Sequence, residues 1–164
     1  MSYERWLPSD DLDRLPVERD GVRLRAPKGW EARIRREVAK GGDNSFTVLH
    51  AATVLLPADR ADYGGGVVET LLSSDVFLAL IEFGPDEAGS ALFPDVEALP
   101  TLVVGMFHRH QLQRRLRGQA GVQHFFTLGG RAFCLYVVLG SMANAGALVA
   151  MANETLEGLS IQPR

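Results

Sequence analysis

The stretch of residues 122–139, VQHFFTLGGRAFCLYVVL, decides the fold of this chain of 164 residues. Two runs rich in β-branched and aromatic residues flank Gly129 and Gly130, a dipeptide typical of a two-residue β-hairpin. We therefore predict two antiparallel neighbouring strands, with Leu128 opposite Arg131. The second run is almost wholly apolar, which indicates a strand that is covered on both of its faces.

Three further segments extend this hairpin into a domain. Residues 76–81 are apolar at both alternating sets of positions and predict a second central strand. Residues 45–56 predict another strand, and the segment from Ser141 to about Glu157 carries the apolar stripe of a helix. We expect an α+β fold in which an antiparallel β-sheet is packed between helices as a three-layer α/β/α sandwich, with an N-terminal hairpin and a long C-terminal helix.

The N-terminal hairpin is predicted from residues 21–35, where apolar residues and arginines alternate on both sides of the segment Pro27–Gly29. The alternation places Trp30 on the core side of the hairpin. The arginines on the other side form a secondary surface made of Arg23, Arg25, Arg33 and Arg35. Residues 1–20 have few apolar positions, so we expect a mobile arm there, followed by one α+β domain over residues 21–164.

The sequence VRLRAPKGWE at residues 22–31, followed by strands and closed by a terminal helix, resembles the PsbP-like superfamily of α/β/α sandwich proteins, which includes the bacterial DcrB and LpqN groups. The order of the predicted elements is compatible with this resemblance over residues 21–161. The resemblance implies a binding or assembly role. Because the superfamily has no agreed catalytic site, the resemblance assigns no catalytic residue.

The expected location is the cytoplasm of a bacterium. The first twenty residues lack a basic segment followed by an apolar run, and no apolar run reaches the length of about eighteen residues that a membrane span needs. Bacterial PsbP-like proteins are often lipoproteins that are acylated on an N-terminal cysteine, which is absent here. The single cysteine, Cys134, excludes an internal disulfide, and the arginine-rich composition resembles that of high-GC bacteria.

Charge is sorted along the chain, although the net charge is only −3. The segment 57–97 has nine acidic residues and one basic residue, whereas the segment 98–153 has five arginines and no acidic residue. The two segments either neutralise each other on folding or present opposed patches to partners. A pI near 5.8 and the lack of an RNA-binding signature argue against a nucleic-acid partner.

The basic segment suggests the function. Residues 109–117 are interpreted as a short amphipathic helix with Leu112 and Leu116 facing inward. Guanidinium groups suit carboxylate partners. The predicted partner-binding residues are Arg109, Arg114, Arg115 and Arg117. We therefore expect a non-enzymatic binding or assembly module, without a cofactor, that docks an acidic protein partner; a merely solvated face is the competing interpretation.

Two other functions stay open. His108 and His110 have the alternate spacing by which a strand offers two imidazoles to zinc, with His50, His124 or a distant carboxylate as a third ligand, in a small-ligand or metal-dependent enzyme. No local carboxylate is available to orient these histidines, so we predict no metal site. The acidic and basic segments could also join copies of the chain into a homo-oligomer.

Cys134 is the best candidate for a nucleophile, with His124 as its base. The predicted hairpin places His124 opposite Leu135 and Cys134 opposite Phe125, so that the histidine and the cysteine project from opposite faces of the sheet. A catalytic pair requires hydrogen-bond reach. We therefore predict a buried, unreactive Cys134 and assign no catalytic residue.

Overall fold

The computed structural model describes residues 15–38 and 45–164 of the chain. Their strands form two antiparallel sheets, one of three strands and one of five. The three-stranded sheet has the order β1-β2-β8, with β1 (Val17–Arg19), β2 (Val22–Leu24) and β8 (Leu159–Ile161). The five-stranded sheet has the order β3-β4-β5-β7-β6, with β3 (Glu31–Val38), β4 (Ser45–Ala52), β5 (Val76–Glu82), β6 (Ala120–Leu128) and β7 (Arg131–Leu139).

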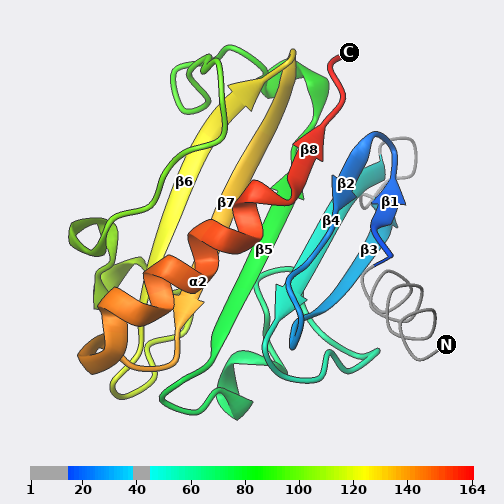
Figure 1. Cartoon of the computed structure of the whole chain (residues 1–164). Coiled ribbons are helices and arrows are strands. Elements are labelled where there is room, and N and C mark those ends of the chain that lie inside the picture. The colour runs from blue at the N-terminus through cyan, green and yellow to red at the C-terminus, as the bar shows by residue number, and fades with distance from the viewer. Residues whose placement is uncertain (1–14, 39–44) are drawn as a thin grey trace, which may run out of the picture.

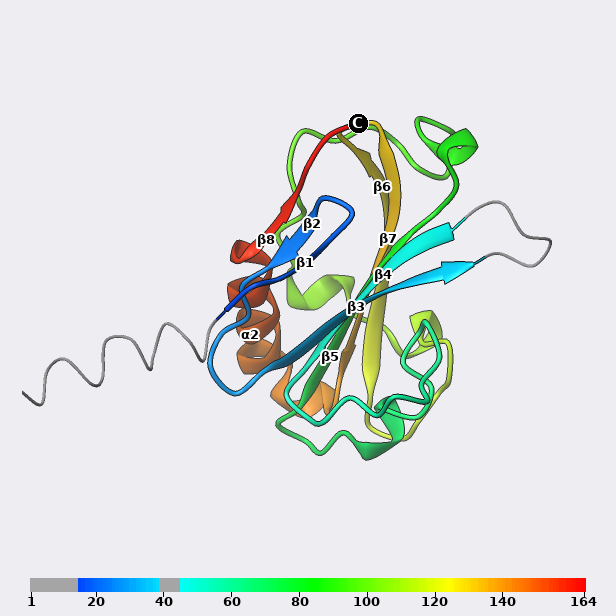
Figure 2. The same ribbon diagram turned by 90° about the vertical axis from the view of Figure 1, so that its right-hand side faces the viewer.

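The described residues contain one α-helix, α2 (Ala145–Glu157), and several short 3-10 turns. The turns are η1 (Val68–Thr70), η2 (Pro85–Glu87), η3 (Val104–Met106), η4 (Arg109–Gln111) and η5 (Met142–Asn144). Helix α2 and the three-stranded sheet lie on the same face of the five-stranded sheet (Figures 1 and 2). The predicted helical stripe is confirmed, because its members are all buried: Ala145, Leu148, Val149, Ala152 and Leu156.

The other face of the five-stranded sheet is covered by loops, so the predicted three-layer α/β/α sandwich is wrong. Leu56, Val67 and Leu112 come from irregular segments and belong to the apolar cluster on this face. Between β4 and β5 the chain packs directly on the sheet at Gly64, which has a φ of 84° and where a Cβ would lie 2.6 Å from the ring of Phe77. With one α-helix and two sheets in the described residues, the fold is mostly β.

The central hairpin agrees with the sequence prediction in detail. Strands β6 and β7 pair with Leu128 opposite Arg131, Phe125 opposite Cys134 and His124 opposite Leu135. Both glycines of the connecting turn have positive φ, 60° and 77°, as a tight hairpin turn requires. All positions of β5 and β7 are buried, which confirms that these strands are covered on both faces.

The predicted N-terminal hairpin over residues 21–35 is wrong, because β2 and β3 lie in different sheets. The turn forms earlier, at Asp20 and Gly21, whose φ values of 53° and 76° suit a tight turn between β1 and β2. The other edge of β2 pairs with β8 at the end of the chain. Trp30 still packs against the main core, as its position in the alternation predicted.

Strand β1 falls inside the segment that the sequence assigned to an arm. Because Val17–Arg19 pairs with β2, the folded part of the chain includes residues that precede Gly21. The rest of the predicted arm, residues 1–14, lies outside the described residues. In residues 15–38 and 45–164, no helix has the length and apolar character of a membrane-spanning segment.

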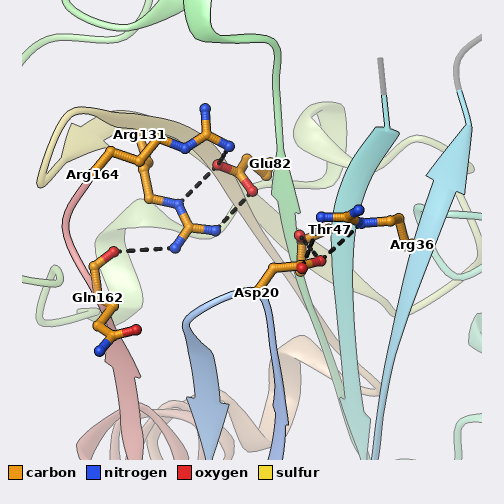
Figure 3. Close-up of polar contacts among 7 residues, drawn as sticks. All are labelled: Asp20, Arg36, Thr47, Glu82, Arg131, Gln162 and Arg164. Carbon is orange, nitrogen blue, oxygen red and sulfur yellow. Dashed lines mark hydrogen bonds and ion pairs between the residues drawn. The ribbon is translucent and has the colours of Figure 1, made fainter. Parts of the chain in front are cut away.

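A polar contact holds the β1–β2 turn against the larger sheet (Figure 3). The carboxylate of Asp20 accepts hydrogen bonds from Nε of Arg36 at 3.0 Å and from the hydroxyl of Thr47 at 3.1 Å. A second guanidinium nitrogen of Arg36 lies 2.7 Å from the same carboxylate. The turn is thereby fixed to both β3 and β4.

Candidate protein-docking surface

The four arginines of the predicted docking surface lie in a segment that is mostly irregular. Only Arg109–Gln111 forms a helical turn, and it is a single 3-10 turn. Leu112 follows with extended backbone, at a ψ of 135°. The predicted helix over residues 109–117 is therefore wrong, although Leu112 is buried as that prediction required.

Tertiary contacts fix this segment in place of helical hydrogen bonds. His108 and Gly121 exchange two backbone hydrogen bonds of 2.9 and 3.1 Å, which attach the start of the segment to β6. The backbone N–H of Gln113 donates to the hydroxyl of Tyr136 at 2.9 Å. Near its end, the side-chain amide of Gln119 donates to the carbonyl of Val68 at 2.8 Å. The arginines between these contacts are carried on an anchored loop.

Three of the four arginines are exposed and form no ion pair with a described residue. These are Arg109, Arg115 and Arg117, and we refer to them as the basic surface. Arg109 and Gly118, the neighbour of Arg117, line one hollow of about 320 Å³ together with the exposed side chain of Met142. The basic surface therefore borders, at Arg109, a shallow hollow that also offers an apolar contact.

Arg114, the fourth predicted residue, differs from the other three. Its guanidinium lies 2.8 Å from the carboxylate of Glu69, with 64% of the Arg114 side chain exposed. An ion pair in that setting is weak, because water screens it. Glu69 also accepts a hydrogen bond from the backbone N–H of Gly66, in the glycine-rich turn over residues 64–66. That N–H is therefore not available to a ligand.

The two histidines of the segment lie side by side. The rings of His108 and His110 stack, with centroids 5.0 Å apart and an angle of 20° between their planes. In the described ranges, no group of three or more His, Cys, Asp or Glu side chains is placed to hold a metal ion. His50 and His124, the proposed third ligands, lie on β4 and β6, and no such group includes them.

The structure divides the predicted secondary surface. Arg23 belongs to β2 and Arg25 follows it, whereas Arg33 and Arg35 belong to β3 of the other sheet. The four do not form one hairpin face, because that hairpin does not exist. Arg33 lies 2.9 Å from Glu31, and Arg35 lies 2.7 Å from Asp62.

Arg35 is part of a buried polar cluster that sequence analysis did not find. At its centre is His50, whose side chain on β4 is fully buried. Its Nε2 lies 2.7 Å from the carbonyl oxygen of Asp62, and its Nδ1 accepts a hydrogen bond of 2.7 Å from Nε of Arg60. Arg35 adds a hydrogen bond of 2.9 Å to the carbonyl of Arg60. We call these four residues the His50 cluster: Arg35, His50, Arg60 and Asp62.

The protonation state of His50 follows from its surroundings. Its pKa is lowered to about 4, mainly by burial and also by the positive charges of Arg60 and Arg35, while the hydrogen bond to the carbonyl of Asp62 acts in the opposite direction. The ring is therefore neutral near pH 7, with its proton on Nε2 facing the carbonyl. Both nitrogens are engaged, so His50 holds the loop before β5 against β4 and is not free to act as a base.

Cys134 is an apolar core residue, as predicted. It is fully buried, and this burial raises the pKa of its thiol to about 12. The register of β6 and β7 places His124 and Cys134 on opposite faces of the sheet, which confirms the prediction that they form no catalytic pair. The thiol therefore lacks both the base and the thiolate character that a nucleophile needs.

The acidic and basic segments of the chain are in part neutralised by each other. Glu82 and Arg131 form a buried bidentate ion pair, with nitrogen–oxygen distances of 2.9 and 2.8 Å (Figure 3). Arg131 also donates to the carbonyl of Gln162 at 3.1 Å, and Arg164 lies 3.4 Å from Glu82. Two carboxylates of the acidic segment, Glu69 and Glu82, thus form ion pairs with arginines of the basic segment.

Comparisons with known proteins return nothing for this chain. It matches no protein-family model, no curated protein and no solved structure. The resemblance to PsbP-like proteins therefore stays a prediction, while the three-layer arrangement that it implied is corrected by the fold.

Proposed function

We propose that this protein is a non-enzymatic binding module that docks an acidic protein partner through the basic surface. The observation that supports the proposal is the exposure of Arg109, Arg115 and Arg117 without a carboxylate partner among the described residues. Guanidinium groups form short, bidentate hydrogen bonds with carboxylates. An acidic surface on a partner would supply the carboxylates that the described part of the chain does not place there.

The anchoring of the loop adds a second argument. The hydrogen bonds made by His108 and Gln113 hold the backbone on both sides of Arg109 before any partner arrives. A surface that is already ordered loses less conformational entropy on binding than a free loop does. The exposed Met142 at the hollow beside Arg109 offers an apolar contact within the charged surface.

The ion pair between Arg114 and Glu69 makes Arg114 unsuitable for a charge-reversal test of docking. Because Arg114 already pairs with Glu69, its replacement by Glu would set two carboxylates against each other and disturb the loop itself. Arg115 and Arg117 are exposed and make no such contact with a described residue. The informative variant is therefore the double replacement Arg115→Glu with Arg117→Glu.

The test measures binding of a fluorescent acidic peptide, rich in Glu and Ser, by anisotropy. The matched control is Arg19→Glu with Arg23→Glu, two exposed positions on the three-stranded sheet with the same change in net charge. We expect about a tenfold or greater loss of affinity for the first pair and less than about a twofold change for the control. Equal losses in both pairs, or no loss in either, would contradict the proposal.

The partner itself is identified by affinity capture from the native host. A protein recovered by the wild type and by the control pair, but lost with Arg115→Glu and Arg117→Glu, is the one that the basic surface binds. The proposal includes the cytoplasmic location expected from the sequence. Fractionation of host cells with an antibody against the protein tests that location.

A further inference from the structure

The two edges of the five-stranded sheet differ in how they are covered. At the β6 edge, His108 exchanges backbone hydrogen bonds with Gly121. At the other end of the strand, the backbone of Thr127 accepts from Val96 at 2.9 Å and donates to Pro94 at 2.8 Å. Between them, the backbone N–H of Gln123 donates to the side-chain oxygen of Gln111, and the side-chain amide of Gln123 donates to the backbone carbonyl of Gln111. This edge is closed by the chain's own loops.

The β3 edge has no comparable cover within the described residues. Strand β3 is eight residues long and pairs with β4 on one side only. Arg33 folds back along its own strand, where it donates to the carbonyl of Ala32 at 2.8 Å and lies 2.9 Å from Glu31. A strand edge of this length presents a row of backbone groups to which another extended chain can add.

A hollow with a mixed lining lies beside the same edge, and Lys28, Glu31 and Arg33 are its charged residues. It has a volume of about 520 Å³ and lies between β1, β2 and the first half of β3, where Val17, Leu24 and Trp30 line it. A second hollow of about 490 Å³ shares Trp30 with the first and extends to Leu55. Leu15 and Leu55, one in each hollow, are 65% and 83% exposed. The second hollow lies at the end of the β3–β4 pair, so exposed apolar residues gather around the N-terminal end of β3.

The alternation of β3 fixes what an added strand meets on each side. Ala32 and Ile34 pack toward the main core, on the side of the hollow. Glu31, Arg33 and Arg35 occupy the alternate positions, and Glu31 and Arg33 also line the hollow. A strand added at this edge would therefore place one set of side chains beside the apolar residues of the hollow and the other set beside these charged residues. Apolar residues suit the first set and acidic residues the second.

A second copy of this chain fits the edge poorly. If two copies of β3 paired antiparallel along their full length, Arg33 of each would lie opposite Arg36 of the other, and Ile34 opposite Arg35. Like charges directly opposite each other destabilise a sheet. The exposed Lys28 at the hollow adds one more positive charge to this side of the molecule. The charges of the edge thus favour an acidic strand over a copy of β3.

We propose that the β3 edge binds an extended segment of a partner protein in which apolar and acidic residues alternate, and that this segment adds a strand to the five-stranded sheet. Its apolar side chains enter the hollow beside Trp30, and its acidic side chains lie against Arg33. This site is separate from the basic surface and goes beyond the function proposed above.

The test uses synthetic peptides of about nine residues, the length that spans β3. One peptide alternates Val or Leu with Glu, and a control peptide has the same composition with its apolar and acidic residues in two blocks. Two further versions of the alternating peptide are N-methylated at every second residue, one version for each alternating set. Only one set of amides in an added strand faces β3, so only one version should lose its binding.

The protein variants locate the site. We expect Arg33→Glu to weaken binding of the alternating peptide about tenfold, and Arg23→Glu, the same charge change at an exposed position of β2, to alter it less than about twofold. The block peptide should bind at least about tenfold more weakly than the alternating one.

Several results would overturn this inference. Equal binding of the alternating and block peptides would show that strand register is irrelevant, and equal binding of the two N-methylated peptides would exclude strand addition. Loss of binding with Arg115→Glu and Arg117→Glu, but not with Arg33→Glu, would place the peptide on the basic surface and leave the proposed function intact. Concentration-dependent dimers in sedimentation that Arg33→Glu dissolves would make a second copy the occupant.

Discussion

The His50 cluster and the basic surface are built from the same kinds of side chain, but only one of them is available to a partner. In the cluster, Arg60 donates to His50, and Arg35 reaches the carboxylate of Asp62. On the basic surface, Arg115 and Arg117 are exposed and have no such acceptors among the described residues. The local supply of carbonyl and carboxylate oxygens, and not the number of arginines, distinguishes a structural site from a docking surface.

The largest expected effect is a difference in stability between variants of the His50 cluster and variants of the basic surface. Replacing His50 with Ala removes two hydrogen bonds and leaves a buried space, so we expect the free energy of unfolding to fall by about 3–4 kcal/mol. Arg115→Ala, on the basic surface, should change it by no more than about 0.5 kcal/mol. Urea unfolding of both variants measures the difference. Similar losses of unfolding free energy in the two variants would contradict the distinction between the His50 cluster and the basic surface.

Acidic pH should weaken the cluster through the same residue. In the folded protein the pKa of His50 is about 4, below its ordinary value of 6.5, so the unfolded chain binds a proton first as the pH falls. The contribution of the neutral His50 to the free energy of unfolding is unaffected above pH 6.5. It is lost progressively between about pH 6.5 and pH 4, by about 2–3 kcal/mol in all. Unfolding curves of the wild type and of His50→Gln should show this loss in the wild type alone. Parallel losses in both proteins would contradict it.

A smaller effect tests whether the basic surface depends on its anchors. Tyr136→Phe removes the acceptor of the Gln113 N–H and should lower the free energy of unfolding by about 1 kcal/mol. Because the loop is then less well ordered, affinity for the acidic peptide should fall about two- to fivefold. Anisotropy titration measures the change. An unchanged affinity at lowered stability would show that anchoring is irrelevant to docking.

The smallest expected effect concerns the exposed ion pair between Arg114 and Glu69. Glu69→Gln releases Arg114 while keeping an oxygen for the backbone of Gly66. We expect a change in unfolding free energy below about 1 kcal/mol, because the pair is exposed, and a gain of about twofold in affinity for the acidic peptide. A loss of affinity would mean that Glu69 belongs to the binding site.

The sequence predicted those parts of the fold that depend on local signals. The Gly129-Gly130 turn determined the register of β6 and β7, and the apolar stripe of α2 followed from helical periodicity. The first hairpin was misplaced because the Pro27–Gly29 turn was favoured over Asp20-Gly21, and because the pairing of β2 with β8 joins distant parts of the chain. The loop layer near Gly64 depends on close packing against Phe77, which has no sequence periodicity.

The sequence predicted which arginines make up the candidate site, but not which of them form an ion pair within the molecule. An acid-free stretch with four arginines indicated a basic surface; all four are exposed, and three of them form no ion pair with a described residue. That Arg114 would find Glu69 could not be seen, because 45 positions separate them in the chain. The role of His50 was hidden for another reason: its partners Arg60 and Asp62 are near in sequence but come from a loop whose path is set by tertiary packing.

The most direct test of docking at the basic surface is to map the binding of the acidic peptide by NMR. The account predicts that the amide and arginine side-chain signals that shift come from residues 108–118, that their shifts shrink as salt rises, and that Arg115→Glu with Arg117→Glu abolishes them. Shifts confined to the β3 edge, or spread evenly over all exposed arginines, would contradict it.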